Sequence, residues 1–434
     1  MNLALLTPGT GSYHCGVCMR DNALAREFIR QGHRAVLLPM YLPLTLDEQA
    51  ASPDVPIFFG GISTYLREKA PLFRRMPRWI DRVLSARWLL KLLAGRAAKT
   101  GGPEVAEMTL SMLRGEEGNQ AGELEQLIVW LASAFDGGPP DAILLATALQ
   151  AGLARKIRAA LNVPVIGFLQ GEDTFLDGLG NRAPEVWRLL SERMRDATAW
   201  VAPSHYFAGL MARRLGWREE EIAVVPNGVD VRAFVRKGGG PGAATVGFLA
   251  RLVPGKGIGV LIEAFIQVSR RMPGVRLRCA GSMTADDARY VEKLKARVRA
   301  AGCEADVEWL PNVSLDEKVR FLESLTVFSV PAIHSEAFGQ YVIEALAMGV
   351  PVVMPRASAF PEIVEATGGG VLFEPGASDV AGAASLADAL ESLLKDPARA
   401  RGLGEAGRAG VARDFSMSRM AERVVDFVGA HRKK

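Results

Sequence analysis

Two glutamates, Glu336 and Glu344, are separated by seven residues that include the aromatic-glycine step Phe338-Gly339. The apolar run at 327–330 predicts a strand, so Glu336 is expected in a loop at the carboxyl end of that strand. Glu344 is then expected near the start of the following helix. Open parallel α/β sheets bind ligands at such strand ends, and a helix amino terminus favours phosphate. The spacing by itself also fits an ordinary strand-loop-helix unit with two surface glutamates.

Two cations, Arg251 and Lys256, follow another predicted strand at 245–249. A guanidinium and an ammonium directed at one point suit a diphosphate, and would stabilise the charge that builds on it as it leaves. Loop cations are often merely solvated, but these belong to the same predicted sheet as the glutamate pair. We therefore expect Glu344 to bind ribose hydroxyls and Glu336 to bind sugar hydroxyls. The backbone N–H groups expected to meet the distal phosphate are those of Phe338, Gly339 and Gln340.

The elements that must position these residues alternate between apolar strands and amphipathic helices in both halves of the chain. A chain of 434 residues is too long for one ordinary core and indicates two domains. The predicted fold class is α/β, with two Rossmann-like parallel-sheet domains facing across a cleft. The expected parts are residues 1–236 with a basic helical insertion at about 62–136, a glycine-rich linker at 237–242, residues 243–415, and a carboxyl-terminal helix at 416–434 that packs back on the first domain.

Charge, apolar run length and cysteine count argue against nucleic-acid-binding, membrane-spanning and disulfide-rich secreted classes of protein. The net charge of +4 is too small to indicate a nucleic-acid partner, and no apolar run reaches the length of a transmembrane helix. The amino terminus reads as a strand and not as a signal peptide, and four cysteines do not make a disulfide framework, so a cytoplasmic location is expected. The first glycine loop, residues 8–16, lacks the G-x-G-x-x-G fingerprint, which argues against a nicotinamide cofactor.

The segment 66–99 interrupts the α/β alternation. It holds ten basic residues against two acidic ones, and its apolar residues recur at helical spacing with Trp79 among them. These are the properties of a helix that lies at a membrane surface, so one interpretation is peripheral contact with anionic membrane at the inner face. Two others are a surface helix packed on the domain and a segment that binds an acceptor.

Several motifs in order give this chain its family resemblance. It resembles the retaining nucleotide-sugar glycosyltransferases of family 4, which have the two-Rossmann glycosyltransferase B fold. The resemblance covers nearly the whole chain except about residues 42–136. Its matching stretches are Pro226–Asp230, Gly247–Gly257, Ser335–Pro351 and Pro361–Val364, together with the Cys15-Gly16 loop and the helix after it.

The resemblance implies a function and a set of roles. The second domain would bind a nucleoside-diphosphate-sugar donor, and the first would face an acceptor that the sequence does not identify. Glu336, Arg251 and Lys256 would be the catalytic residues, with Gly16 facing the donor phosphate and Val313 flanking the base. Retaining enzymes of this kind have no dedicated nucleophile, because the leaving phosphate helps to deprotonate the acceptor. No permanently bound cofactor and no metal requirement are expected.

One departure from the family concerns the loop after a first-domain strand. The family often has a histidine there that meets the donor sugar, and this chain has Gln170. A glutamine can donate to and accept from sugar hydroxyls but cannot carry a proton. Glu172 and Asp173 follow, and are expected either to bind acceptor or sugar hydroxyls or to be solvated loop carboxylates.

A second departure is the pair Cys15 and Cys18 at the head of the first helix, beside His14. A Cys-x-x-Cys there can be redox-active or can hold part of a metal site. The other two cysteines, Cys279 and Cys303, lie in the second domain, so no four-ligand metal site is evident. This favours an interpretation in which Cys15 and Cys18 pack in the protein or line the cleft.

Three rival functions remain open on the sequence. A nucleotide-sugar epimerase of the same fold would change the donor with no acceptor present. A sugar-nucleotide binding protein without turnover is suggested by Gln170. A thiol oxidoreductase would use Cys15 and Cys18 and bind no sugar nucleotide.

Overall fold

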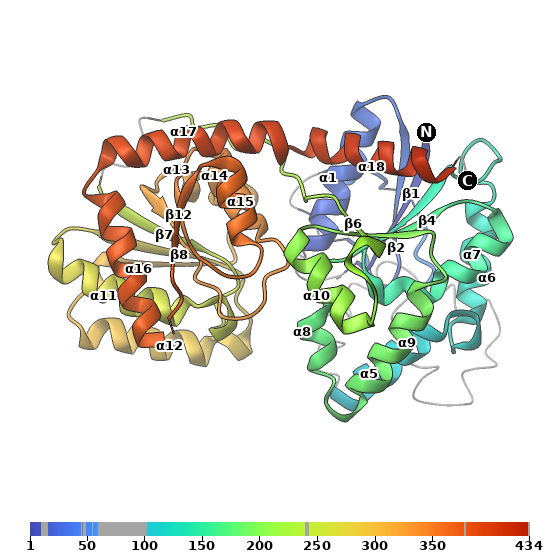
Figure 1. The fold of residues 1–434 in the computed structure, drawn as a ribbon, viewed down its shortest axis with the longest axis horizontal. Coiled ribbons are helices and arrows are strands. Elements are labelled where there is room, and N and C mark those ends of the chain that lie inside the picture. Colours follow the sequence, from blue (N-terminus) through green and yellow to red (C-terminus); the bar gives the residue numbers. More distant parts are fainter. Residues whose placement is uncertain are drawn as a thin grey trace. The chain divides into compact units, whose positions relative to one another are not determined.

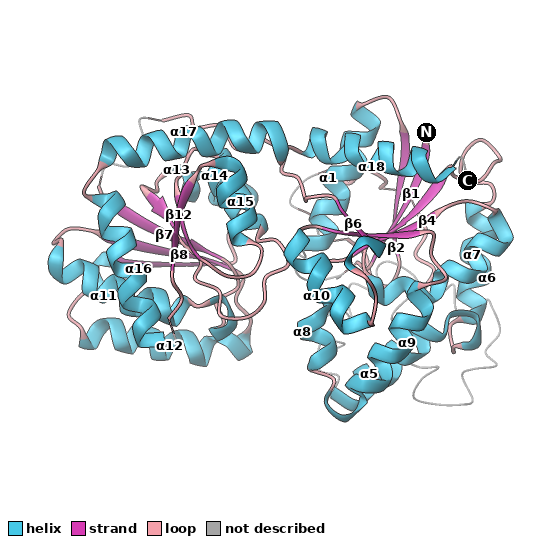
Figure 2. Ribbon diagram, viewed as in Figure 1, coloured by secondary structure: helices cyan, strands magenta, loops and turns pink. Residues whose placement is uncertain are grey.

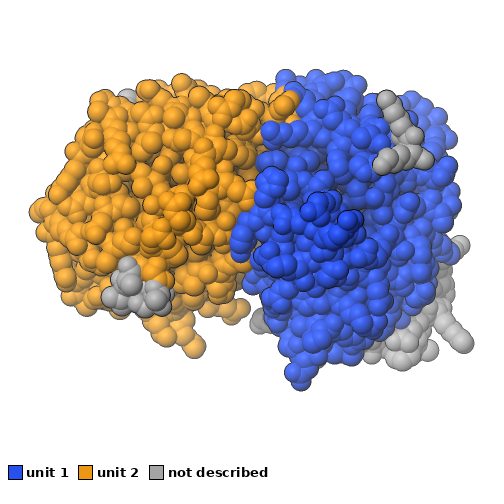
Figure 3. All heavy atoms as spheres, viewed as in Figure 1, with its two compact units in different colours: residues 1–226, 420–434 blue, residues 227–419 orange. Residues whose placement is uncertain are grey.

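The chain forms two compact α/β units, residues 1–226 with 420–434 and residues 227–419 (Figure 1, Figure 3). In each unit a parallel sheet is accompanied by helices that connect its strands (Figure 2). This computed structural model describes residues 1–9, 16–44, 46, 49–53, 55–59, 102–238, 243–376 and 379–432.

The sheet of the first unit is built from short apolar strands. Its order is β2-β1-β3-β4-β5-β6, and all neighbouring pairs are parallel. Strands β3 and β4 are buried along their whole length, as expected where helices cover both faces of a parallel sheet. The strands are β1 (Asn2–Thr7), β2 (Arg34–Pro39), β3 (Ala142–Leu145), β4 (Val165–Phe168), β5 (Ala199–Ala202) and β6 (Ile222–Val224).

Helices connect these strands and cover the sheet. Residues 148–153 form a short 3-10 helix, at whose start the Thr147 hydroxyl accepts from the Leu149 N–H, and α-helical geometry begins only at Ala154. The helices that the described residues of this unit form are α1 (Gly16–Arg30), α5 (Gly102–Arg114), η2 (Gly115–Glu117), α6 (Ala121–Leu131), η3 (Ala148–Leu153), α7 (Ala154–Leu161), α8 (Glu172–Asp177), η4 (Gly180–Arg182), α9 (Ala183–Met194), α10 (His205–Leu215) and η5 (Glu219–Glu221).

The second unit repeats the pattern with strand order β12-β11-β10-β7-β8-β9, again parallel throughout. Strand β10 is shorter than the predicted run, since only two of its residues enter the ladder. The strands are β7 (Thr245–Leu249), β8 (Arg276–Gly281), β9 (Val307–Pro311), β10 (Val327–Phe328), β11 (Val352–Pro355) and β12 (Gly370–Phe373).

The core of the second unit lies between this sheet and the helices on its faces, with Phe248, Phe265 and Phe328 fully buried. Its helices are η6 (Pro254–Lys256), α11 (Ile258–Arg271), α12 (Ala285–Ala300), η7 (Glu304–Asp306), α13 (Leu315–Glu323), α14 (Gln340–Ala347), α15 (Phe360–Thr367), α16 (Asp379–Leu394) and α17 (Pro397–Asp414). The last helix, α18 (Met417–Arg432), begins in this unit and continues in the first. At its start the Ser416 hydroxyl accepts a hydrogen bond from the Arg419 N–H at 3.2 Å.

The predicted fold class, two Rossmann-like parallel-sheet domains, is confirmed. The predicted domain bounds stay a prediction. The structure divides the units after Pro226, and residues 239–242 of the expected linker lie outside the described residues, as do 60–101 of the expected insertion.

Candidate functional site

Two neighbouring strands of the second unit bring the predicted donor-binding loops together. Strand β10 pairs with β7, so the loops that follow them leave the same edge of the sheet. The Gly255 carbonyl accepts hydrogen bonds from the Ile333 and His334 N–H groups at 3.0 and 3.2 Å. Gly257 has φ +72°, and a Cβ there would lie 1.7 Å from the Pro331 carbonyl oxygen. This close approach places the loop that carries Lys256 against the loop that carries Glu336.

Lys256 and Glu336 form an ion pair in which the Nζ contacts Oε2. The Tyr341 hydroxyl donates to the same Oε2 at 2.8 Å. The two charged side chains are 32% and 16% exposed, so the pair is partly accessible from solvent. Burial and then the Glu336 carboxylate raise the pKa of Tyr341 well above its usual range, so its hydroxyl remains a proton donor.

Glu344 has its own cationic partner, which the sequence did not identify. The Lys318 Nζ of α13 donates to Glu344 Oε1 at 2.9 Å, and both side chains are only 13% exposed. The Lys318 ammonium also lies 5.7 Å from the centre of the Phe234 ring. Nothing in the spacing of the α13 sequence marked Lys318, because its partner lies on another helix.

Arg251 faces a different carboxylate from Lys256. Its guanidinium donates to both oxygens of Asp287, at 3.1 and 3.2 Å. Asp287 also accepts from the Thr284 backbone N–H and hydroxyl at the start of α12. Although burial opposes it, hydrogen bonding from Thr284 and Arg251 holds the pKa of Asp287 below its usual range. In the structure, therefore, Arg251 and Lys256 have separate partners.

The stretch Phe338-Gly339-Gln340 forms the start of α14. Gly339 is the residue before the first helical turn, with φ +91°, and no side chain caps this helix end. The Gln340 side chain instead donates to the Gly228 carbonyl at 3.0 Å. Phe338 is buried in the core. The predicted phosphate-facing N–H groups thus lie at the positive end of a helix.

Val313 follows β9, where the chain is tied to the loop after β8. The Asn312 side chain accepts from the Met283 N–H at 2.9 Å and donates to the Met283 carbonyl at 3.1 Å. Asn312 itself has φ +58°, a left-handed conformation that asparagine tolerates better than most residues. Val313 packs at the edge of the core cluster.

In the first unit, Glu172 connects two strand-end loops. Its Oε1 accepts from the Thr147 hydroxyl at 2.7 Å and the Ala148 N–H at 2.9 Å. Its Oε2 accepts from the N–H groups of Gln170 at 2.8 Å and Gly171 at 3.1 Å. A carboxylate with four internal donors organises the loop that carries Gln170.

The other predicted residues of the first unit differ in accessibility. Gln170 is half-buried and Asp173 is buried at the start of α8. Gly16 opens α1, and among the described residues beyond its own helix and chain neighbours no atom lies within 4 Å of where a Cβ would be. Cys18 is fully buried, whereas His14 and Cys15 lie outside the described residues, as does the basic segment 66–99. Burial raises the pKa of the Cys279 and Cys303 thiols.

A buried charged cluster near the start of α1 was also missed. Arg20 and Asp21 are 5% and 3% exposed, and the Arg20 Nε donates to Asp21 Oδ1 at 2.9 Å. The Arg20 guanidinium lies 4.9 Å from the centre of the Phe168 ring at the end of β4. Burial, opposed by Arg20, raises the pKa of Asp21. Helical periodicity placed these residues on α1 but gave no sign that they are buried.

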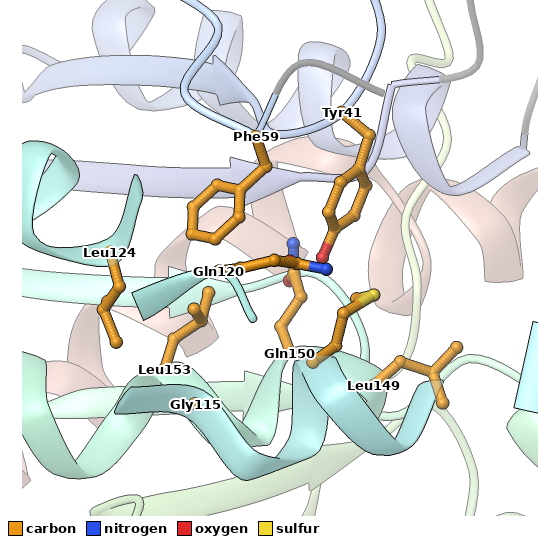
Figure 4. A pocket seen from close by; sticks show the side chains of 9 residues that line it. Tyr41, Phe59, Gly115, Gln120, Leu124, Leu149, Gln150 and Leu153 are labelled. Carbon is orange, nitrogen blue, oxygen red and sulfur yellow. The ribbon is translucent and has the colours of Figure 1, made fainter. Parts of the chain in front are cut away.

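A small pocket lies in the first unit and contains none of the predicted site residues. Tyr41, Gln120 and Gln150 direct polar groups into it from three different segments (Figure 4). Gln150 is fixed there because its Oε1 accepts from the Ala146 N–H at 2.9 Å. The other lining residues are Phe59, Met112, Gly115, Leu124, Leu149 and Leu153.

Two negative observations concern the described part of the chain alone. There, no helix is long and apolar enough to cross a membrane. Within the same residues, no three or more His, Cys, Asp or Glu side chains gather in a way that could hold a metal ion.

The chain matches two family models that adjoin each other. Residues 119–233 match Glycosyltransferase Family 4, and residues 233–410 match Glycosyl transferases group 1. The second match spans both of the predicted donor-binding loops.

Named relatives agree with these matches. The chain is 30% identical over 374 residues to a GDP-mannose-dependent alpha-(1-6)-phosphatidylinositol monomannoside mannosyltransferase of Mycolicibacterium smegmatis, covering 82% of this chain and 91% of the relative. It is 31% identical over 254 residues to a D-inositol 3-phosphate glycosyltransferase of Segniliparus rotundus, covering 56% of this chain and 55% of that relative. The match thus spans only about half the length of the latter relative.

Solved structures share the fold. Anabaena Alr3699/HepE in complex with UDP superimposes with a TM-score of 0.68 at 17% identity, covering 99% of this chain and 100% of the other. Sucrose-phosphate synthase from Thermosynechococcus elongatus superimposes with a TM-score of 0.67 at 16% sequence identity. The match covers 98% of this chain and 97% of the synthase.

Proposed function

Because the chain belongs to the family 4 glycosyltransferases, as its sequence resemblance indicated, we propose that it transfers a sugar from a nucleoside-diphosphate-sugar donor to an acceptor with retention of anomeric configuration. The observation that carries this proposal is the pairing of Lys256 with Glu336 beside the open amino end of α14. A cation, a carboxylate and a helix amino terminus meet the needs of a diphosphate joined to a sugar.

Each group of the proposed donor would have a partner in the second unit. Lys256 and Arg251 would bind the diphosphate, and the N–H groups at the start of α14 would bind its distal phosphate. Glu344, fixed by Lys318, would accept from the ribose hydroxyls. Val313 would flank the base. Glu336 would accept from hydroxyls of the transferred sugar.

The proposed reaction needs no enzymic nucleophile. As the bond from the sugar to the diphosphate breaks, negative charge builds on the leaving phosphate, where Lys256 and Arg251 would stabilise it. That phosphate would take the proton from the acceptor hydroxyl attacking the same face of the sugar. Glu336 would position the sugar and is not assigned as a general base. We expect no metal requirement, so EDTA should leave activity unchanged.

The acceptor side is proposed for the first unit. Gln170 would contact the donor sugar, and its backbone is held by Glu172. Both Glu172 oxygens already accept hydrogen bonds within the protein, so Glu172 would act on an acceptor by organising this loop. Asp173 would bind acceptor hydroxyls. The names of two relatives contain D-inositol 3-phosphate and phosphatidylinositol monomannoside, so these are the first acceptors to test.

The proposal is tested by screening GDP-mannose and UDP-glucose for thermal stabilisation, followed by mass spectrometry of the products. Lys256→Ala and Glu336→Ala should each lower transfer by about 100-fold or more while the protein remains folded. Wild-type turnover in either variant would contradict the assigned roles. An isomerised donor without acceptor would favour an epimerase, and binding without transfer or donor hydrolysis would favour a binding protein.

Contact with membrane through residues 66–99 stays a prediction, since that segment lies outside the described residues. Co-sedimentation with liposomes that contain anionic lipid tests it. Absence of binding at low salt would remove the membrane interpretation.

A further inference from the structure

The proposed roles of Lys256 and Glu336 require both residues to find new partners when a donor arrives. In the structure the Lys256 ammonium is occupied by Glu336, yet it is expected to bind the diphosphate. Glu336 in turn is expected to bind the sugar, and would lose its neutralising cation at that moment. Some other group must then hold the carboxylate in place.

Tyr341 supplies such a group. Its hydroxyl donates to Glu336 Oε2 at 2.8 Å, the oxygen that Lys256 also contacts. The Tyr341 ring packs against the rings of Phe328 and Phe360, whose centres lie 6.2 and 6.4 Å from its own. This packing fixes the position from which the Tyr341 hydroxyl donates. Lys256 has a long flexible stem and three donors, and is the more readily exchanged partner.

The backbone of Glu336 is fixed independently of Lys256. The Ser358 hydroxyl accepts from the Glu336 N–H at 3.2 Å, and the Glu336 carbonyl accepts from the Ala359 N–H at 3.3 Å. Ser358 has φ +55°, a left-handed conformation that is uncommon for serine. Strained residues of this kind persist where the surrounding structure holds them, often at functional sites.

We propose that Tyr341 is a positioning residue that holds the Glu336 carboxylate toward the donor sugar while Lys256 leaves Glu336 for the donor diphosphate. This inference rests on the proposed function. The resting ion pair keeps Lys256 in place before the donor binds, and a diphosphate with more than one negative charge competes for it. Tyr341 retains its proton throughout and remains a donor to Glu336.

The first test compares binding of a nucleoside diphosphate with binding of its sugar nucleotide by calorimetry. The probes are GDP with GDP-mannose and UDP with UDP-glucose. In Tyr341→Phe we expect the diphosphate Kd to stay within about twofold of wild type, because Lys256 is intact. The Kd of the sugar nucleotide should rise about tenfold, as expected for loss of a hydrogen bond to a charged group. If Tyr341 had a merely structural role, its replacement would weaken the binding of both ligands to the same extent.

Tyr41→Phe is the control, since it removes a phenol hydroxyl from the first unit, outside the residues proposed to bind the donor, and is expected to change neither Kd. Equal loss of affinity for diphosphate and sugar nucleotide in Tyr341→Phe would overturn the proposal. An unchanged affinity for both would overturn it as well.

The second test addresses the exchange of Lys256 and does not depend on Tyr341→Phe folding. Glu336→Gln keeps the shape of the side chain but removes the charge that holds Lys256. We expect this variant to bind GDP or UDP about threefold to tenfold more tightly than wild type, since the diphosphate no longer competes with a carboxylate. Unchanged or weaker binding would mean that Lys256 does not exchange, and would overturn the proposal.

These outcomes separate the inference from the proposed function. A wild-type protein that binds neither probe pair overturns both. A wild-type protein that binds a sugar nucleotide, with variants that behave like it, overturns the inference alone.

Discussion

At the scale of single residues, the role of each site carboxylate depends on the hydrogen-bond donors and cations that surround it. Glu172 accepts four hydrogen bonds from the two strand-end loops that it connects. Glu336 and Glu344 each form an ion pair with a lysine side chain. The sequence marked all three as site residues, but only their surroundings separate a carboxylate that shapes a loop from one that is available to a ligand.

Replacing Glu172 with glutamine should destabilise the first unit by about 2 kcal/mol. One carboxylate oxygen becomes an NH₂ group that must face hydrogen-bond donors on either side, so at least one buried donor is left unsatisfied. Urea denaturation measures the change. The exposed Glu220→Gln is the control and should be neutral. A Glu172→Gln protein as stable as wild type would show that the four contacts contribute little.

At the scale of the elements, helix starts and tight loops position the candidate donor site. Asp287 caps α12 and also binds Arg251, so one side chain joins a helix terminus to a predicted diphosphate ligand. Gly257 lets the loop after β7 pass close to the loop after β10. Both features depend on local geometry that a larger or uncharged side chain would change.

The Asp287 cap should make a pH-dependent contribution to stability. Its pKa is lowered in the folded protein, so the stabilisation is fully present above the ordinary aspartate pKa and is lost as pH falls through the folded value. The destabilisation caused by Asp287→Asn should therefore be larger at pH 7 than near pH 3. Denaturant titrations of both proteins at the two pH values measure it; an equal difference at both would contradict the expectation.

Gly257→Ala should be much more damaging than a glycine substitution that only strains φ. Gly302 has φ +75° with no atom within 4 Å of a new Cβ, whereas at Gly257 the Cβ would overlap a carbonyl oxygen. We expect Gly302→Ala to cost about 1 kcal/mol and Gly257→Ala several times more, with weakened binding of GDP or UDP. Similar losses of stability in both variants would mean that the loop moves aside readily.

At the scale of the whole molecule, the last helix contributes to the first unit although it follows the second in sequence. Ala421, Val424 and Val428 of α18 are buried. Arg432 pairs with Asp141 at 2.8 Å, and Asp141 accepts from the Asn2 N–H at 2.7 Å. The first strand and the last helix are thus linked through one aspartate.

Deleting residues 420–434 should destabilise the first unit by roughly 3 kcal/mol or more, because buried apolar side chains are lost and the surface beneath them is exposed. Thermal unfolding of the shortened and full-length chains measures the effect. A chain lacking only residues 433–434 is the control. Unfolding at the same temperature in all three would indicate that α18 does not support this unit.

The sequence by itself determined the fold class and the loops that carry the candidate donor site. Strand-length apolar runs alternate with amphipathic helices, and this periodicity is local, so it can be read without knowing the contacts. It also placed Glu344 in the helix that follows the Glu336 loop, which is α14 in the structure. The catalytic and binding roles given to these residues remain predictions.

Tertiary structure decided which charged groups meet. Lys256 and Glu336 are 80 residues apart in the chain, Arg251 and Asp287 are 36 apart, and Lys318 and Glu344 are 26 apart. Periodicity places each of these on a loop or helix but says nothing about which loops share a sheet edge. The strand order β10-β7-β8 sets the first two pairs, because the loops after β7 lie beside the loops after β10 and β8. Because the energy of a charge depends on its partners and burial, the chemistry of the site became specific only in the fold.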